Sequence, residues 1–280
     1  MIIDFHTHIF PETIVNNREL FFKAEPAFTL LYQNPESKLA VIEDLIDMMD
    51  EQEIDMSVVC GFPWKSPDLF KQNNDYVADA VAKYSKRIKG FGCFDIENRH
   101  IHKETERCLK NGLCGIGELA LYRSGIDTGK RKLLEPVMEV CRTRDLPVLI
   151  HTNEAIGRMY AGKSPLTLRQ IYDLALAFPD NTIILAHWGG GIFFYQLMKH
   201  EVKRVLSNIY YDTAASPYLY DPKIYKIAID LVGIEKILFS SDYPLLTPSR
   251  YFEEFRSAGL ESSQINAICG GNAMRILKLL

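Results

Sequence analysis

Eight short apolar segments alternate with amphipathic stretches along this 280-residue chain, and the alternation constrains the fold more than any other feature. Residues 56–61 (MSVVCG), 147–151 (PVLIH) and 182–187 (TIILAH) are typical of the short segments, which are apolar almost throughout. Strands of this kind are buried on both faces, as in parallel sheets that are covered by helices. Eight such units predict an α/β protein with a closed (β/α)₈ TIM barrel.

The predicted elements leave no linker or change of composition, so we expect a single domain over residues 1–280. Apolar residues recur with period 3.6 in the predicted helices, whereas the strands are short apolar runs. The strands are expected at residues 2–8, 56–61, 88–94, 115–118, 147–151, 182–187, 208–212 and 236–241. The helices are expected at 38–52, 74–85, 102–111, 135–144, 166–178, 193–206, 221–232, 250–258 and 262–280. Pro136 is tolerable because it lies in the first turn of its helix.

Residues 9–37 form a long segment without a clear period, and they contain three prolines and an aromatic cluster. Loops of this length in compact domains are often functional. We expect the aromatic residues either to cover one rim of the barrel as an apolar wall or to form a contact between subunits. The cluster consists of Phe21, Phe22, Phe28 and Tyr32.

Composition excludes several classes of protein. The net charge is −4 and the basic residues are scattered, which argues against a nucleic-acid partner. No apolar run reaches the ~18–20 residues that span a bilayer, and no signal-peptide pattern precedes the first strand. The six cysteines lack CxxC spacing and read as free thiols in a reducing compartment. We therefore expect a cytoplasmic protein without a membrane partner.

The first strand ends in His6-Thr7-His8. Side chains two residues apart on a strand point to the same face, so both imidazoles leave the strand on one side. Two neutral imidazoles on a rigid element can hold a divalent metal. Two unrelated histidines near a terminus are the alternative, and partners at the ends of other strands would decide between the two.

Such partners follow the later strands, at the rim where barrels of this type place their active sites. Four of the seven histidines lie at predicted strand ends, together with two acidic residues. The predicted metal ligands are His6, His8, Glu118, His151, His187 and Asp242. Glu118 has a second interpretation, as a cap or an arginine partner, and Asp212 is expected to hydrogen-bond a ligand histidine.

These residue types fit the chemistry of a divalent cation. Imidazoles and carboxylates suit Zn²⁺ and also accept Mn²⁺ or Fe²⁺. A bound cation lowers the pKa of its water towards ~7. Asp242 would take the proton of that water, and His187 would stabilise the developing oxyanion. We predict Zn²⁺ as the metal and Asp242 and His187 as the catalytic residues.

The same residues resemble a known family. The motifs DFHTHIFP, GIGE, VLIHTNE, ILAHWGGG, YYDTAAS, FSSDYPL and GGNAMRIL are similar over the whole chain to those of the amidohydrolase superfamily. They look closest to its "amidohydrolase 2" branch, which also contains nonoxidative decarboxylases. The resemblance implies that His6, His8, His151 and Asp242 are ligands. It also implies that His187 is a ligand if two metals bind and an acid or base if one does.

Glu118 departs from the decarboxylases of that branch and resembles the bridging glutamate of two-metal members. It favours our leading hypothesis, a hydrolase of a small amide, lactone or ester. The alternatives are a metal-dependent nonoxidative decarboxylase of an aromatic or unsaturated acid, and a metal-bearing barrel that only binds a ligand. The partner is expected to be a small molecule, and a homo-oligomer is possible.

Substrate contacts are the least constrained part of the prediction. Arg123 or Arg158 could clamp a carboxylate, although exposed loop arginines are commoner than clamps. Tyr160 lies in the loop after the fifth strand, and Trp188 is either core or part of the pocket. We take Arg123, Arg158, Tyr160 and Trp188 as candidate substrate-binding residues.

Overall fold

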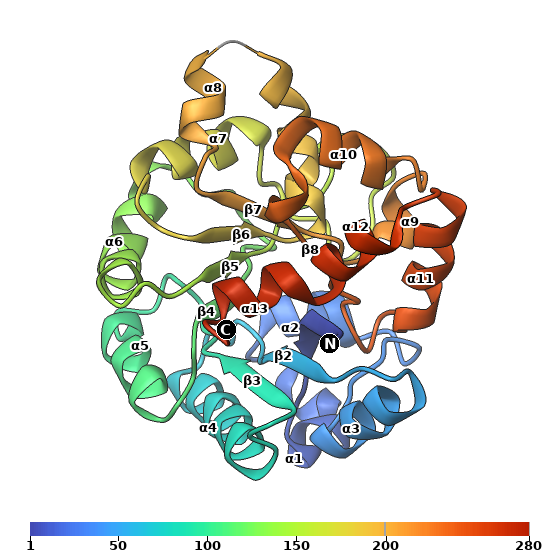
Figure 1. Ribbon diagram of the computed structural model, residues 1–280. Coiled ribbons are helices and arrows are strands. Elements are labelled where there is room, and N and C mark those ends of the chain that lie inside the picture. The colour runs from blue at the N-terminus through green and yellow to red at the C-terminus, as the bar shows by residue number, and fades with distance from the viewer. Residues whose placement is uncertain (199, 280) are drawn as a thin grey trace.

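The computed structural model describes residues 1–198 and 200–279, and its eight parallel strands form the expected barrel (Figure 1). Two sheets with the orders β1-β2-β3 and β4-β5-β6-β7-β8 contain all of them. The strands are β1 (Ile3–His8), β2 (Met56–Cys60), β3 (Ile88–Phe91), β4 (Ile116–Leu119), β5 (Val148–Ile150), β6 (Ile183–Leu185), β7 (Ile209–Asp212) and β8 (Ile237–Leu238).

Backbone hydrogen bonds join the two sheets at both seams. Between β3 and β4, the Gly117 N–H donates to Gly92 O at 2.8 Å. Between β8 and β1, the Phe5 N–H donates to Phe239 O at 2.9 Å, and the Asp242 N–H donates to His6 O at 2.9 Å. These bonds close the sheets into a barrel, so the predicted fold class is confirmed.

Helices surround the strands, and one end of the barrel is covered (Figure 1). The outer helices are α3 (Ile42–Glu51), α4 (Pro67–Lys83), α5 (Ile101–Lys110), α6 (Thr128–Thr143), α7 (Leu168–Ala177), α8 (His200–Val205), α10 (Ile224–Val232) and α11 (Pro248–Ser257). The short helix α13 (Asn272–Ile276) crosses the end of the barrel at which β1 begins. The strand C-termini therefore lie at the opposite end.

Alternation of side chains along each strand divides the buried apolar residues into two layers. An outer layer, which includes Val59 and Val148, packs between strands and helices. An inner cluster, which includes Val58 and Leu149, fills the barrel. The register of β1 against β2 shifts between Asp4 and Thr7, so β1 carries one extra residue, a β-bulge. The bulge lies directly beside His6.

Several predicted helices differ from the structure. Helix α4 begins at Pro67 rather than at 74. Helix α6 begins at Thr128 rather than 135, so Pro136 lies inside the helix and not in its first turn. Residues 193–206 do not form one helix. A 3₁₀ segment, η2 (His187–Leu197), precedes α8, because residues 188–191 all have positive φ angles, which an α-helix excludes. The segment 262–280 is divided into α12 (Ser262–Asn266), a π-helical turn and α13. Residues 199 and 280, in two of these predicted helices, lie outside the described residues.

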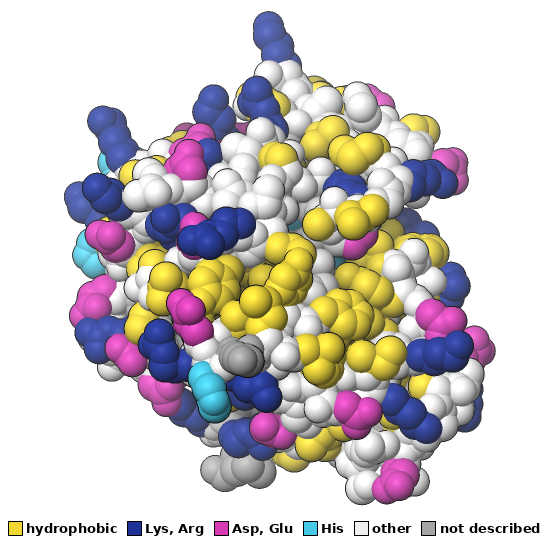
Figure 2. Space-filling model, turned by 90° about the horizontal axis from the view of Figure 1, so that it is seen from above, with side chains coloured by type: hydrophobic (Ala, Val, Ile, Leu, Met, Phe, Trp, Pro, Cys, Tyr) yellow, Lys and Arg dark blue, Asp and Glu magenta, His cyan; other side chains and the backbone are white. Residues whose placement is uncertain are grey.

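The segment 9–37 is not a plain loop, since it contains α1 (Glu12–Val15), η1 (Arg18–Phe21) and α2 (Pro26–Tyr32). Among the described residues, no helix is both long and apolar enough to cross a membrane. On the face shown in Figure 2, acidic and basic side chains are interspersed around a band of apolar ones. This face carries no field of a single sign of the kind that binds nucleic acid.

Candidate metal centre

The C-terminal ends of five strands bring the six predicted ligands together. Asp242 Oδ1 lies 3.5 Å from His8 Nε2 and 3.8 Å from His6 Nε2. Glu118 Oε1 lies 2.9 Å from His151 Nδ1 and 3.6 Å from His187 Nε2. The cluster is largely buried, with Asp242 and His8 the most exposed of the six at 14% and 13% of their side chains. The six residues predicted from the sequence therefore lie close together in the structure.

Each of the four histidines has one ring nitrogen next to a protein oxygen outside the cluster. A neutral imidazole carries one proton, and the hydrogen bond of one nitrogen fixes which nitrogen is protonated. The four contacts are His6 Nδ1 to Asp212 Oδ2 at 2.8 Å, His8 Nδ1 to Gly61 O at 3.1 Å, His187 Nδ1 to Ala214 O at 3.0 Å and His151 Nε2 to Gly162 O at 3.0 Å. The remaining nitrogen of each ring faces the centre.

The four inward nitrogens carry lone pairs when the rings are neutral, and this is where a cation fits. His6 Nε2 and His8 Nε2 lie only 3.0 Å apart. Two lone pairs at that distance repel each other unless a positive charge lies between them. Imidazole ligands that donate their other N–H to a carboxylate or a backbone carbonyl are typical of metal sites. The residues thus suit a divalent metal.

Glu118 offers a different oxygen to each pair of histidines. Its Oε1 faces His151 and His187, whereas its Oε2 lies 3.7 Å from His6 Nε2 and 3.8 Å from His8 Nε2. Two groups of three possible ligands result, His6 with His8 and Glu118, and His151 with His187 and Glu118. The atoms of each group lie within 4.8 Å of one another. The arrangement has room for one cation or for two bridged by Glu118.

The electrostatics of the cluster keep its carboxylates charged. Burial opposes ionisation of Glu118, but its electrostatic interactions with His151 and His6 hold its pKa well below the usual range. Burial likewise opposes ionisation of Asp242, and the hydrogen bond from His8 and the charge of His6 lower its pKa. Two buried anions facing four imidazoles attract a cation.

Buried polar residues hold the ligands from behind. The Asp212 carboxylate, which is fully buried, accepts the His6 Nδ1–H at Oδ2 and the backbone N–H of His187 at Oδ1, 2.8 Å away in both cases. The hydrogen bond that we predicted between Asp212 and a histidine is therefore present. A second support is the carboxyl group of Asp4, which accepts the Ser241 N–H at 2.9 Å and also bonds to its hydroxyl group.

The Asp4 contact matters because Asp242 follows Ser241 in a left-handed conformation with φ of 62°. This region is unfavourable for residues other than glycine, so the neighbouring contacts must stabilise it. The sequence analysis did not single out Asp4. Its place near the start of the first buried strand gave no signal of a partner 237 residues away.

The predicted substrate-binding residues lie in different environments. Trp188 is fully buried, donates to Ser216 Oγ at 2.9 Å and packs against Tyr225, so it belongs to the core rather than to an open pocket. Arg123 and Arg158 are exposed. Tyr160 is 40% exposed, and its hydroxyl group donates to Glu154 Oε2 at 2.8 Å.

Aromatic side chains that the sequence did not single out border the centre. The ring of Tyr122 lies 5.0 Å from that of His151, and Phe62 stacks on Tyr122 with an interplanar angle of 11°. Of the predicted aromatic cluster, Tyr32 reaches this row at 5.8 Å from Phe62, whereas Phe28 is buried against Trp64. Tyr122 lies in the turn after β4, only four residues beyond Glu118, and that spacing was the available signal.

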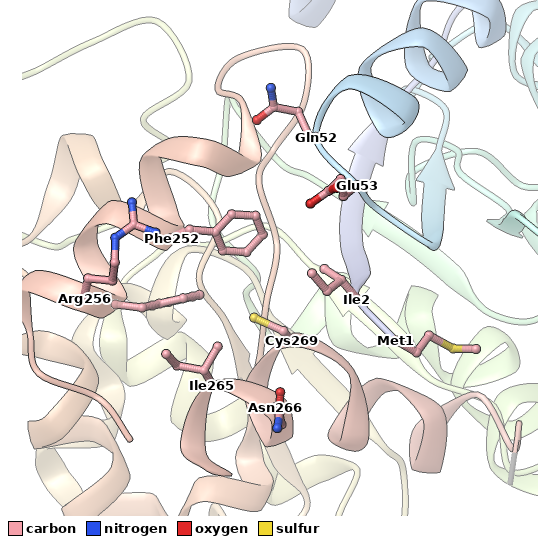
Figure 3. A pocket seen from close by; sticks show the side chains of 10 residues that line it. Met1, Ile2, Gln52, Glu53, Phe252, Arg256, Ile265, Asn266 and Cys269 are labelled. Atoms are coloured by element: carbon pink, nitrogen blue, oxygen red, sulfur yellow. The ribbon is translucent and has the colours of Figure 1, made fainter. Parts of the chain in front are cut away.

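A separate cavity of about 320 Å³ lies at the opposite end of the barrel, beside the start of β1 (Figure 3). Its apolar part includes Ile2, Phe252, Ile265 and Cys269, and Arg256 lies at its edge. Because β1 begins here and carries His6 and His8 at its other end, this cavity is not part of the metal centre.

Comparisons with known proteins agree with this geometry. The family model described as Amidohydrolase matches residues 3–279. The 2-amino-3-carboxymuconate-6-semialdehyde decarboxylase of Dictyostelium discoideum is 23% identical over 337 residues, which cover 99% of this chain and 91% of the relative. The gamma-resorcylate decarboxylase of Polaromonas sp. strain JS666 is 22% identical over 298 residues, covering 87% and 89%.

Solved structures show the same fold. The 5-carboxyvanillate decarboxylase of Sphingomonas paucimobilis has a TM-score of 0.76 at 19% identity, with 99% of this chain and 98% of that chain covered. The 5-carboxyvanillate decarboxylase of Novosphingobium aromaticivorans, solved with manganese, has a TM-score of 0.78 at 16% identity, with 99% and 96% covered.

The leading prediction of a hydrolase for amides, lactones or esters is wrong. Both curated relatives are decarboxylases, and the similarity covers nearly the full length of each. That prediction depended on Glu118. The carboxylate does lie among the possible ligands, but its position determines how many cations fit and not which bond is broken. The choice of Zn²⁺ had no better support, since manganese is the metal in the Novosphingobium structure.

Proposed function

This chain belongs to the amidohydrolase family, and from that premise we propose that it is a metal-dependent, nonoxidative decarboxylase of an aromatic acid. The observation that carries the proposal is the pair of curated relatives, both decarboxylases, which match over 87–99% of this chain. The cluster of four histidines and two carboxylates at the barrel rim supports it, because this chain combines the fold of these decarboxylases with residues that can bind a divalent metal.

The proposed reaction needs no oxidant and no water. The bond between the ring and the carboxylate carbon breaks, CO₂ leaves, and the electron pair that remains on the ring carbon takes up a proton. One proton is consumed for each CO₂ released. The residues of the site must therefore hold the acid, expose one face of its ring and deliver a proton to a carbon atom.

We propose His6, His8, His151 and Asp242 as ligands, with Glu118 and His187 completing the set, and Mn²⁺ as the metal. When bound, the cation supplies a Lewis acid that anchors the acidic oxygens of the substrate. Neutral imidazoles and carboxylates accept Mn²⁺ as well as Zn²⁺. The support for manganese is its presence in the Novosphingobium decarboxylase and in the dihydroxybenzoic acid decarboxylase of Polaromonas.

Asp242 is the residue that we propose to relay the proton. Its carboxylate is ionised at rest, so it first takes up a proton from solvent on the open side of the site and then passes that proton to the ring carbon. Its carboxylate is close to His8 Nε2, 3.5 Å away, and still 14% exposed, so it borders both the ligands and the open side of the site. Its backbone is fixed by the bond from the Asp242 N–H to His6 O. His187 is fixed at Nδ1 by Ala214 O. If a single metal leaves its Nε2 free, the protonated ring can donate that N–H to a substrate oxygen.

The test is decarboxylation by the purified protein loaded with Mn²⁺. Gamma-resorcylate and 5-carboxyvanillate would be incubated in D₂O, with CO₂ release and product deuteration measured together. We expect one deuterium per product molecule, at the ring position that lost the carboxylate, and no activity in His6→Ala. If a panel of aromatic acids yields no CO₂ from fully loaded protein, the proposal fails.

A further inference from the structure

We propose that Tyr32 and Tyr122, which flank Phe62 beside the metal centre, form the wall that recognises the substrate ring and binds an oxygen substituent on it. The inference rests on the proposed function and specifies the substrate class: a single-ring aromatic acid that bears a hydroxyl or methoxy group. Hereafter "the aromatic wall" means Tyr32, Phe62 and Tyr122.

The aromatic wall is continuous and begins at a proposed ligand. The ring centroid of Tyr122 lies 5.0 Å from that of His151 and 6.3 Å from that of Phe62. The centroid of Phe62 lies 5.8 Å from that of Tyr32. The residues come from different segments, the turn after β4, the loop after β2 and the end of α2. The three residues are therefore neighbours only in the folded barrel.

Differences in burial separate the surface of the wall from its backing. Phe62 is 2% exposed, and Phe28 and Trp64, which pack behind it at 5.5 Å and 5.0 Å, are fully buried. Tyr32 and Tyr122 are only partly buried. Tyr122 therefore presents aromatic surface next to a proposed ligand, Tyr32 continues that surface beyond Phe62, and buried aromatic side chains pack against Phe62.

The phenol groups of both tyrosines can donate hydrogen bonds. A tyrosine hydroxyl has a pKa of about 10, so it is protonated at neutral pH and acts as a donor. A carboxylate of the substrate belongs with the cations of the centre, so the oxygen that a phenol meets is a neutral substituent elsewhere on the ring.

These features together favour a flat ring over an open chain. Aromatic faces pack in offset or edge-to-face arrangements with a ring of the substrate. A phenol that donates to a ring hydroxyl or methoxy oxygen fixes the rotation of the ring and hence the position of its carboxylate. An acid without such a substituent would still pack against the wall but would not satisfy the donors.

The experiment compares Tyr122→Phe and Tyr122→Leu, and the same changes at Tyr32, in Mn²⁺-loaded protein. We expect each Leu variant to raise KM for an oxygen-substituted aromatic acid about tenfold through lost packing. Each Phe variant should raise KM about threefold to tenfold for that acid and leave KM unchanged for an analogue without the substituent. Metal content should stay constant, and kcat should change much less than KM. Tyr218→Phe, at a tyrosine that is 59% exposed, is the matched control.

Binding of 2-nitroresorcinol, an inhibitor of the Polaromonas enzyme, separates this inference from the proposed function. Calorimetric binding to the loaded protein requires no turnover. If the Leu variants weaken binding while the parent shows no decarboxylation, the aromatic wall stands and the proposed function fails. If the parent decarboxylates its substrate and all four variants keep the parental KM, the aromatic wall is only core packing. Equal effects of Tyr→Phe on both acids would overturn the assignment of the phenols as donors.

Discussion

His6 and His8 present their Nε2 atoms to each other at 3.0 Å, although the Nδ1 atom of each ring already contacts a protein oxygen. A neutral imidazole has one proton, so both facing nitrogens are acceptors in that state. The contact is stable only when a proton or a metal cation supplies the positive charge. Metal binding and the stability of the barrel rim are therefore coupled.

Removing metal should lower the thermal stability of the protein. A ligand that binds only the folded state at 100 times its Kd adds about 2.7 kcal/mol to the free energy of unfolding. We expect a chelator to lower Tm and added Mn²⁺ to restore it, as measured by calorimetry. In His8→Ala the response to Mn²⁺ should be much smaller. An identical Tm in stripped and loaded parent protein would contradict the coupling.

Asp212→Asn should weaken metal binding without unfolding the protein. The carboxylate accepts from His6 on one oxygen and from the backbone N–H groups of His187 and Ala214 on the other. Whichever way an asparagine turns, its NH₂ group faces one of these donors. Loss of such a supporting contact typically costs 10- to 100-fold in metal affinity, about the change that we expect in a chelator competition assay. Asp230→Asn, at an exposed site on α10, should leave the affinity unchanged.

Asp4 should make the metal-free protein less stable as the pH rises. Burial raises its pKa from 3.8 to about 7, although the hydrogen bonds from Ser241 and His6 act in the opposite direction. The folded state then binds the proton more tightly than the unfolded state, so this contribution to stability falls with pH between these two values.

Asp4→Asn removes that titration and keeps an acceptor for the Ser241 N–H. Relative to the parent, the variant should gain roughly 2–3 kcal/mol in the free energy of unfolding between about pH 5 and about pH 8. Denaturant unfolding of stripped protein at several pH values measures the difference. Because only the difference between variant and parent is used, the titration of groups that do not interact with Asp4 cancels. A difference that does not vary with pH would refute the raised pKa.

The eight strands, the barrel and the cluster of six candidate ligands were predictable because each depends on local pattern. An apolar run followed by His, Glu or Asp predicts both a buried strand and a candidate ligand at its C-terminal end, as at β5 and His151. The supports were not predictable in the same way. Asp4 with Ser241 and Tyr122 with Phe62 are contacts between segments far apart in the sequence, and the local sequence around each residue is ordinary. The position of Trp188 could not be predicted. A tryptophan next to a candidate ligand has the same local sequence whether its side chain packs in the core, as here against Ser216, or lines a substrate pocket.

Asp242→Asn should separate proton transfer from metal binding. The amide keeps the shape of the side chain and one oxygen, but it cannot deliver a proton to carbon. Losing one acid or base typically costs roughly 10²–10⁴-fold in rate, and kcat for decarboxylation should fall by about that factor. Metal content should fall less than in His6→Ala. If the variant retains activity within about threefold of the parent, far below the loss expected for a missing acid or base, the proton travels through another group such as His187.

The loop between β5 and α7 should depend on Lys163, whose side chain is only 6% exposed. Its Nζ donates to Glu154 Oε1 at 2.8 Å and to the backbone oxygens of Ile156 and Arg158 at 3.1 Å and 3.3 Å. The next residue back, Gly162, contacts His151 Nε2 through its carbonyl oxygen. One lysine therefore links an exposed loop to a proposed ligand.

Lys163→Met preserves the apolar stem and removes all three donations. Breaking a largely buried ion pair by removing one partner typically costs roughly 3–5 kcal/mol, and here the cost should appear as opening of residues 155–161, which are exposed in the closed loop. A loss of only about 1.4 kcal/mol in the free energy of loop opening speeds proteolysis about tenfold. We expect chymotrypsin to cut the variant near Tyr160 at least that much faster, with a higher KM because Gly162 no longer orients His151. Arg169→Met removes a 78% exposed side chain that pairs with Asp173 on α7, and it should change neither quantity. Unchanged cleavage in Lys163→Met would mean that the backbone alone holds the loop.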